Sequence, residues 1–164
     1  MHAATRISRG LRDRGIAVLR FDFTGLGQSE GDFANSNFSS NLDDLRAAVA
    51  AMRSRLQAPS LLVGHSLGGA AALYMASEVP EVKAVAAVFA PSEPAELKKL
   101  LGDRVIEEVE SAGETEVNLG GQKFRVKQQF LDDISTVSLT ERLSTSNKPT
   151  LLFQSPQDLS LIHI

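Results

Sequence analysis

"LLVGHSLGGAAAL", residues Leu61 to Leu73, joins an apolar run to an alanine-rich run through a serine set between glycines. The run before Gly64 is typical of a buried strand, and we expect this strand over residues 60–64. The small residues that follow favour a helix packed closely against a sheet, and we expect it over residues 68–77. The stretch therefore predicts a strand, a sharp turn at Ser66 and a helix.

Apolar runs elsewhere in the chain predict further strands. "IAVLRFDF" is a nearly continuous apolar run bounded by Gly15 and Gly25, as expected for a strand covered on both faces. Strands are expected over residues 16–23, 83–89 and 150–154. Because strands alternate with helical segments, the class is α/β, with a parallel sheet and right-handed crossovers.

Two helices flank the first expected strand. Apolar residues share one helical face over residues 2–14, and Gly15 stands where a left-handed C-terminal cap would fall. A second helical stripe begins at Asn41, with Ser40 and Asp43 placed to cap its first turn. Pro59 ends that segment.

Residues from about 91 to 149 are more than a single crossover helix needs, and we interpret them as an inserted cap. Charged helical stretches near 94–101 and 104–111 lead into "TEVNLGGQKFRVK". There apolar and polar residues alternate on both sides of Gly120-Gly121, which predicts a β-hairpin.

Composition excludes several classes of protein. The chain has 164 residues, a formal net charge of −3 and no dense Lys/Arg block, so neither nucleic acid nor an anionic membrane is favoured as a partner. No apolar run reaches the length of a membrane span, and the N-terminus lacks the core of a secretory signal, so we expect a cytoplasmic setting. The absence of cysteine excludes disulfides and thiolate metal sites within this stretch.

Gly64-His65-Ser66-Leu67-Gly68 fits the pattern G-x-S-x-G. A serine at a sharp strand-to-helix turn takes a strained backbone, and glycines on either side avoid collisions with the turn. The turn aims the N-terminus of the next helix at the serine, so the backbone N–H of Leu67 can donate to an oxyanion. We interpret Ser66 as a nucleophile; the alternative is a structural turn serine.

A serine nucleophile needs a base, and the chain has three histidines: His2, His65 and His163. His65 is adjacent to Ser66, but neighbouring residues at such a turn project in different directions. We therefore expect His65 to pack against neighbouring strands and not to act as the base.

The carboxylate that orients a catalytic histidine should follow a later strand, because α/β sheets gather functional groups at the carboxyl ends of their strands. Asp158 in "TLLFQSPQD" has this place and follows Ser66 in the chain order serine, acid, histidine. The alternative is a turn aspartate after Pro156. Asp132-Asp133 is a rival pair that we interpret as a solvated helix face.

"DFTGLGQSEG", Asp22 to Gly31, could be mistaken for a phosphate-binding loop. Its glycines miss the dinucleotide pattern by one position, and Glu30 and Asp32 would repel a phosphate. We expect a structural loop beside Ser66, with Asp22 and Ser29 making local hydrogen bonds.

Together these motifs resemble an α/β-hydrolase, most closely the branch in which a serine hydrolase domain is fused to an OsmC-type domain. The resemblance runs from about His2 to Asp158 and is carried by "AVLRFDFTGLGQSEGDFANSNFSSN", "LLVGHSLGGAA" and "VNLGGQKFRVKQQFLDD". It implies a serine hydrolase acting on a small-molecule ester or related acyl bond, without metal or organic cofactor. Ser66 would be the nucleophile, Leu67 an oxyanion donor through its backbone, and Asp158 the triad acid.

The chain departs from the family at both ends. The family has strands and an oxyanion-hole loop before the first helix, and its histidine follows a further strand after the acid. We therefore expect residues 1–158 to be a partial hydrolase domain that is inactive as given. The ending "LSLIHI", residues 159–164, looks like a translated transposon end, so we expect a non-native tail in which His163 is not the base. The alternative function is a noncatalytic scaffold for the fused OsmC-type domain.

Overall fold

A computed structural model describes residues 2–119 and 121–154. The helices and strands follow one another in this order: α1 (His2–Arg12), the 3₁₀ helix η1 (Phe33–Asn35), α2 (Phe38–Arg55), β1 (Leu61–His65), α3 (Leu67–Ala76), β2 (Ala84–Val88), the 3₁₀ helix η2 (Pro94–Glu96), α4 (Leu97–Leu101), α5 (Asp103–Ala112), β3 (Glu114–Leu119), β4 (Gln122–Lys127), α6 (Gln128–Thr136), α7 (Leu139–Ser144) and β5 (Thr150–Phe153).

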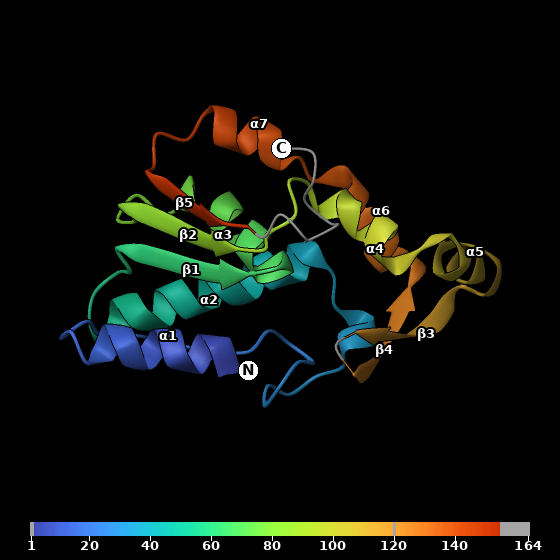
Figure 1. Cartoon of the computed structure of the whole chain (residues 1–164), viewed down its shortest axis with the longest axis horizontal. Coiled ribbons are helices and arrows are strands. Elements are labelled where there is room, and N and C mark those ends of the chain that lie inside the picture. The colour runs from blue at the N-terminus through green and yellow to red at the C-terminus, as the bar shows by residue number, and fades with distance from the viewer. Residues whose placement is uncertain (1, 120, 155–164) are drawn as a thin grey trace.

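The central sheet has three parallel strands in the order β1-β2-β5 (Figure 1). Leu61 pairs with Ala84 and His65 with Val88, so β1 and β2 end side by side. The strands expected over residues 60–64, 83–89 and 150–154 are confirmed, and so is their parallel arrangement. The carboxyl ends of all three strands therefore meet at one edge of the sheet.

The strand expected over residues 16–23 is wrong. This segment has no strand partner in the structure, and Ile16, Val18, Leu19 and Phe21 are all more than a third exposed. A continuous apolar run predicts an extended, buried backbone, but a strand also needs a neighbour to complete its ladder of hydrogen bonds. The apolar pattern does not show whether a neighbouring strand is present.

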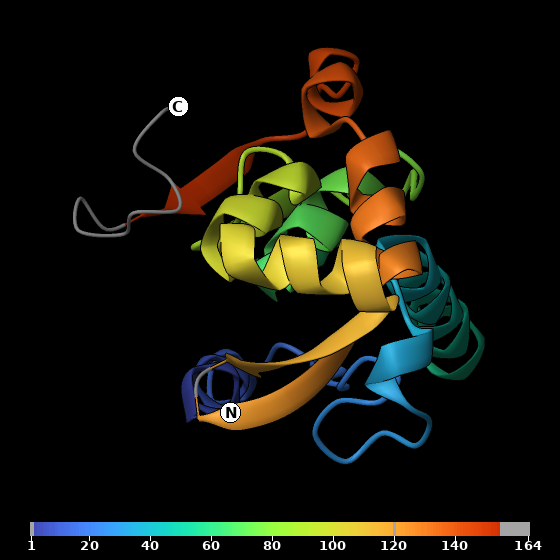
Figure 2. The ribbon, with the colours of Figure 1, turned by 90° about the vertical axis from the view of Figure 1, so that its right-hand side faces the viewer.

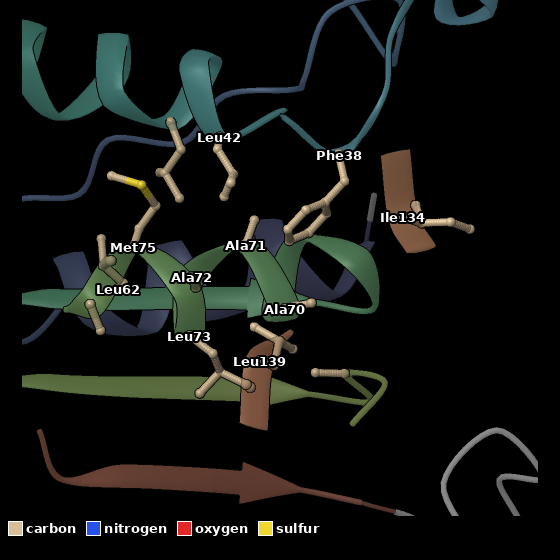
Figure 3. Close-up of a cluster of buried hydrophobic side chains, with 14 of the residues drawn as sticks. Phe38, Leu42, Leu62, Ala70, Ala71, Ala72, Leu73, Met75, Ile134 and Leu139 are labelled. Carbon is tan, nitrogen blue, oxygen red and sulfur yellow. The ribbon is translucent and has the colours of Figure 1, made fainter. Parts of the chain in front are cut away.

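The core lies between the sheet and the helices α2 and α3. Ala70, Ala71 and Ala72 of α3 are buried, and their small side chains let the helix approach both the strands and α2. Figure 3 shows Phe38 and Leu42 of α2 pointing toward this alanine face. The other face of β1 is more open, since Leu61 and Val63 are 38% and 41% exposed.

The end of α1 and the start of α2 both have well-defined caps. Gly15 has a φ of +78°, and the N–H of Ile16 donates to the carbonyl of Leu11, which confirms the left-handed cap after α1. The start of α2 differs from expectation: its N-cap is Asn37, which forms a reciprocal capping box with Ser40. Asp43 instead pairs with Arg46.

The segment 91–149 contains the expected helices and hairpin. Strands β3 and β4 pair antiparallel, and they lie away from the central sheet beside α4, α5 and α6 (Figures 1 and 2). Aromatic contacts join η1 to the hairpin and to α6: the ring centroid of Phe33 is 5.0 Å from that of Phe124 on β4 and 5.9 Å from that of Phe130 on α6. Lys127 Nζ also donates to Asn35 Oδ1 at 2.8 Å.

Candidate active site

Ser66 stands between β1 and α3 in a backbone conformation that non-glycine residues rarely adopt, with φ 53° and ψ −129°. Two sets of hydrogen bonds hold it there. Its N–H donates to the carbonyl of Val88 on β2 at 2.8 Å, and its own carbonyl accepts from the N–H groups of Gly69 and Ala70. The sharp, strained turn expected at Ser66 is therefore present.

The glycines around Ser66 allow the strand and the helix to meet. A Cβ on Gly64 would overlap the carbonyl of Gly68 and lie 2.6 Å from the Cα of Gly69. A Cβ on Gly68 would meet only Phe23 Cε2, at 3.3 Å. The expected collision thus exists at Gly64 and is mild at Gly68.

Gly69 lies outside the G-x-S-x-G pattern, but its position also requires glycine. A Cβ there would lie 2.8 Å from the Cβ of Ala90, just beyond β2. The repeated Gly68-Gly69 pair was the available signal, because adjacent glycines at the start of a helix indicate close packing on both sides.

The hydroxyl of Ser66 makes no capping hydrogen bond to α3, although serine at an N-cap commonly does so. Leu67 and Gly68 are the first two residues of α3, and N–H groups at these positions have no acceptor within the helix. They also carry the partial positive charge of the helix N-terminus. A half-buried serine and the N-terminus of a helix therefore lie at the same point.

Of the three histidines, His65 is the one whose side chain the structure describes. It ends β1 opposite Val88, and its ring lies edge-to-face against Phe89, with centroids 5.9 Å apart. This agrees with the interpretation of His65 as a residue packed against the neighbouring strand. His163 lies outside the described residues.

The loop Asp22 to Gly31 has the local hydrogen bonds expected of it. Asp22 Oδ2 accepts from the N–H of Gln28 at 3.1 Å, and the Ser29 hydroxyl donates to the carbonyl of Asp22. Asp44 on α2, which the sequence did not suggest, accepts from both the N–H and the hydroxyl of Thr24. The loop is thereby fixed to α2.

The sequence offered three carboxylates as the acid, and the structure describes two of them, Asp132 and Asp133. Asp158 lies outside the described residues, so its role as the acid stays a prediction. Asp132 accepts from Gln128 on its own helix, α6. Asp133 is not merely solvated: it accepts from the N–H of Ser39 at 2.8 Å and from its hydroxyl at 2.6 Å, and so caps the first turn of α2.

A shallow cavity of about 330 Å³ lies between α4, α5 and β3. Its lining mixes apolar and charged side chains, and none of them belongs to the turn at Ser66. They are Leu100, Leu101, Arg104, Val105, Glu108, Glu116, Val117 and Asn118.

Across residues 2–119 and 121–154, no helix combines the length and apolar character of a membrane span.

Comparison with known proteins points to hydrolases. Residues 2–102 match the family model described as serine aminopeptidase, S33. The esterase domain of a Rhodothermus marinus protein is 45% identical, with a TM-score of 0.67 over 94% of this chain and 58% of that one. Est1E from Butyrivibrio proteoclasticus, solved with ferulic acid, is 25% identical, with a TM-score of 0.75 over 94% of this chain and 63% of that one.

A mouse protein, α/β-hydrolase domain-containing protein 10, is 20% identical with a TM-score of 0.66 over 93% of this chain and 74% of that one, and it supports the fold alone. No curated protein matches the chain. The chain spans about three fifths of the length of the Rhodothermus marinus and Butyrivibrio proteoclasticus structures. Its fold is that of the α/β-hydrolases, with a parallel sheet flanked by helices.

Proposed function

Because the chain belongs to the serine aminopeptidase S33 family of hydrolases, we propose that the protein it is part of is a serine hydrolase with Ser66 as its nucleophile. One observation carries the proposal. Ser66 has a strained backbone at the carboxyl end of β1, and its hydroxyl makes no capping hydrogen bond at the N-terminus of α3. Strain of this kind gathers at functional sites, and a purely structural turn would favour glycine.

The chemistry assigned to each residue follows from its place. Ser66 Oγ attacks the acyl carbon while a histidine takes up the hydroxyl proton; the carbonyl oxygen becomes an oxyanion, and the N–H of Leu67 donates to it. The alcohol then leaves with that proton, giving an acyl-enzyme that water hydrolyses. Asp158 orients the histidine, for which we propose a residue other than His65 and His163.

The substrate class that we propose is a small-molecule carboxylic ester. Two similar structures support it: one is described as an esterase domain, and the other holds ferulic acid, the product that an ester of an aromatic acid would give on hydrolysis. The segment 91–149 would shape the pocket for the acyl or alcohol group. The proposal requires no metal or organic cofactor.

Two finer features belong to the same proposal. The first is fusion of the complete protein to an OsmC-type domain, which the sequence resemblance implies and the complete open reading frame tests. The second is a cytoplasmic location. A complete protein that carries the fused domain but lacks turnover would instead be a noncatalytic scaffold.

Hydrolysis of p-nitrophenyl esters tests the proposal. The complete protein should release p-nitrophenolate, the Ser66→Ala variant should retain less than about a thousandth of that rate, and the His65→Asn variant should stay within about threefold of wild type. The isolated 164-residue chain should be inactive. Undiminished hydrolysis by Ser66→Ala would refute the assignment, and no hydrolysis by the complete protein would favour the scaffold.

A further inference from the structure

Phe89 and Ser66 are the two non-glycine residues with positive φ in the described part of the chain. They are also neighbours. Ser66 follows β1, Phe89 follows β2, and the carbonyl that accepts from the N–H of Ser66 belongs to Val88, which is bonded to Phe89. Two strained positions thus lie side by side at the carboxyl edge of the sheet.

A hydrogen bond to β5 fixes the backbone of Phe89. Its N–H donates to the carbonyl of Phe153 on β5 at 2.9 Å, and its φ is 52°. The resulting turn breaks the alternation of the strand, so that Ala87 and Ala90 both approach Gly69 at the start of α3. The fold therefore needs a left-handed residue here, and glycine would supply it without strain.

The side chain of Phe89 is not required to fill the core. Phe89 is 37% exposed, and its ring packs edge-to-face on His65, which is itself exposed. A large aromatic residue thus occupies a position that favours glycine and leaves a substantial part of its surface open. Such a combination is expected where the ring contacts something other than the core.

We propose that Phe89 is a specificity-determining residue whose ring contacts an aromatic or large apolar acyl group of the ester bound at Ser66. The inference rests on the proposed function and deepens it. The backbone of Phe89 lies next to that of Ser66 through the hydrogen bond to Val88, and aromatic rings prefer to pack on one another in offset or edge-to-face arrangements. The ring also packs edge-to-face on His65, with centroids 5.9 Å apart.

Two sulfonyl fluorides that differ by one phenyl group test this proposal on the complete protein. With either probe, a bond forms between Ser66 Oγ and sulfur, the S–F bond breaks, fluoride leaves and the hydroxyl proton is released. The measured quantity is the ratio of the second-order labelling rates for phenylmethanesulfonyl and methanesulfonyl fluoride. Phe89→Ala should lower this ratio at least about tenfold, and Phe89→Leu should lower it less.

Phe89→Gly distinguishes the effect of losing the ring from the effect of relieving the backbone strain. It should lower the ratio as Phe89→Ala does, yet unfold at a higher temperature than Phe89→Ala, because both lack the ring and only alanine carries a strained Cβ. Leu56→Ala is the matched control: Leu56 is 71% exposed at the end of α2, and its loss should leave the ratio unchanged.

The outcomes separate the two proposals. Ser66 labelling with a ratio unchanged in Phe89→Ala, Phe89→Gly and Phe89→Leu would overturn the role of Phe89 and leave the nucleophile in place. Failure of both probes to label the wild-type protein would overturn the proposed function, and the role of Phe89 with it. If Phe89→Ala does not fold, the glycine and leucine variants decide the question.

Discussion

A Cβ on Gly64 would lie 2.5 Å from the carbonyl carbon of Gly68, so β1 and α3 meet at a point with room for no side chain. Real Cβ atoms do not approach other heavy atoms so closely. The neighbouring atoms are backbone and cannot move aside as a flexible side chain could. The position of Ser66 at the edge of the sheet depends on this contact.

Replacing Gly64 by alanine should therefore destabilise the protein far more than replacing Gly68 by alanine. We expect a loss of about 3 kcal/mol or more for Gly64→Ala and less than about 1 kcal/mol for Gly68→Ala, whose Cβ would meet only the edge of the Phe23 ring. Urea unfolding of the complete protein measures both. Equal losses would show that the elbow does not require the close contact.

Asp132 and Asp133 are adjacent on α6 and allow a matched comparison. Asp133→Ala should cost about 1 kcal/mol of stability, because the carboxylate caps the first turn of α2 through Ser39. Asp132→Ala should cost less than about 0.5 kcal/mol, since Asp132 is exposed and its partner is a glutamine on the same helix.

Neither substitution should change covalent labelling of Ser66. A loss of labelling in Asp133→Ala, with stability intact, would instead assign this carboxylate to the reaction.

Glu93 connects η2 to α7 and should make stability depend on pH. Burial tends to raise the pKa of Glu93, but hydrogen bonds from Thr140, Leu139 and Ser138 outweigh it and hold the pKa below its ordinary value. Because the folded pKa is the lower one, the stabilisation is present above the unfolded pKa of about 4.3 and is lost as the pH falls through the folded value.

The Glu93→Gln variant should therefore be less stable than wild type at pH 7, and the difference should shrink below about pH 4. Thermal unfolding across this range measures it, with Glu110→Gln on an exposed part of α5 as the control. A difference that is constant with pH would contradict the assignment to the carboxylate charge.

The segment 16–23 and the outer face of β1 expose apolar side chains that should promote association of the 164-residue chain. Leu19→Lys and Val63→Lys should each delay aggregation, measured by light scattering, because a charge in an exposed extended segment or in the outermost strand of a sheet disfavours pairing with another chain. Leu56→Lys replaces an apolar residue at the end of α2 that is more exposed than either, and it should nevertheless have a smaller effect. Equal effects of all three would refute a role for the unpaired segment.

The parallel sheet and the elbow could be predicted because their signals are local. The apolar runs at β1, β2 and β5 and the glycines around Ser66 each reflect a requirement of the nearby backbone. The hairpin β3–β4 was equally readable, because polar and apolar residues alternate on both sides of its turn.

Features that depend on contacts distant in sequence could not be predicted. The run 16–23 has the composition of a strand, but composition does not provide a partner. The cap from Asp133 to Ser39 joins residues 94 positions apart. The positive φ of Phe89 could not be predicted from the sequence, because phenylalanine rarely adopts one. The need for this conformation arises from the contacts with Gly69 and β5.

Mapping a covalent adduct tests the central claim most directly. The complete protein is treated with a fluorophosphonate probe, and the labelled peptide is sequenced by mass spectrometry beside the Ser66→Ala variant and the 164-residue chain. We predict one adduct on Ser66 in the complete protein, none in Ser66→Ala and almost none in the short chain. An adduct on another serine, or strong labelling of the short chain, would contradict the account.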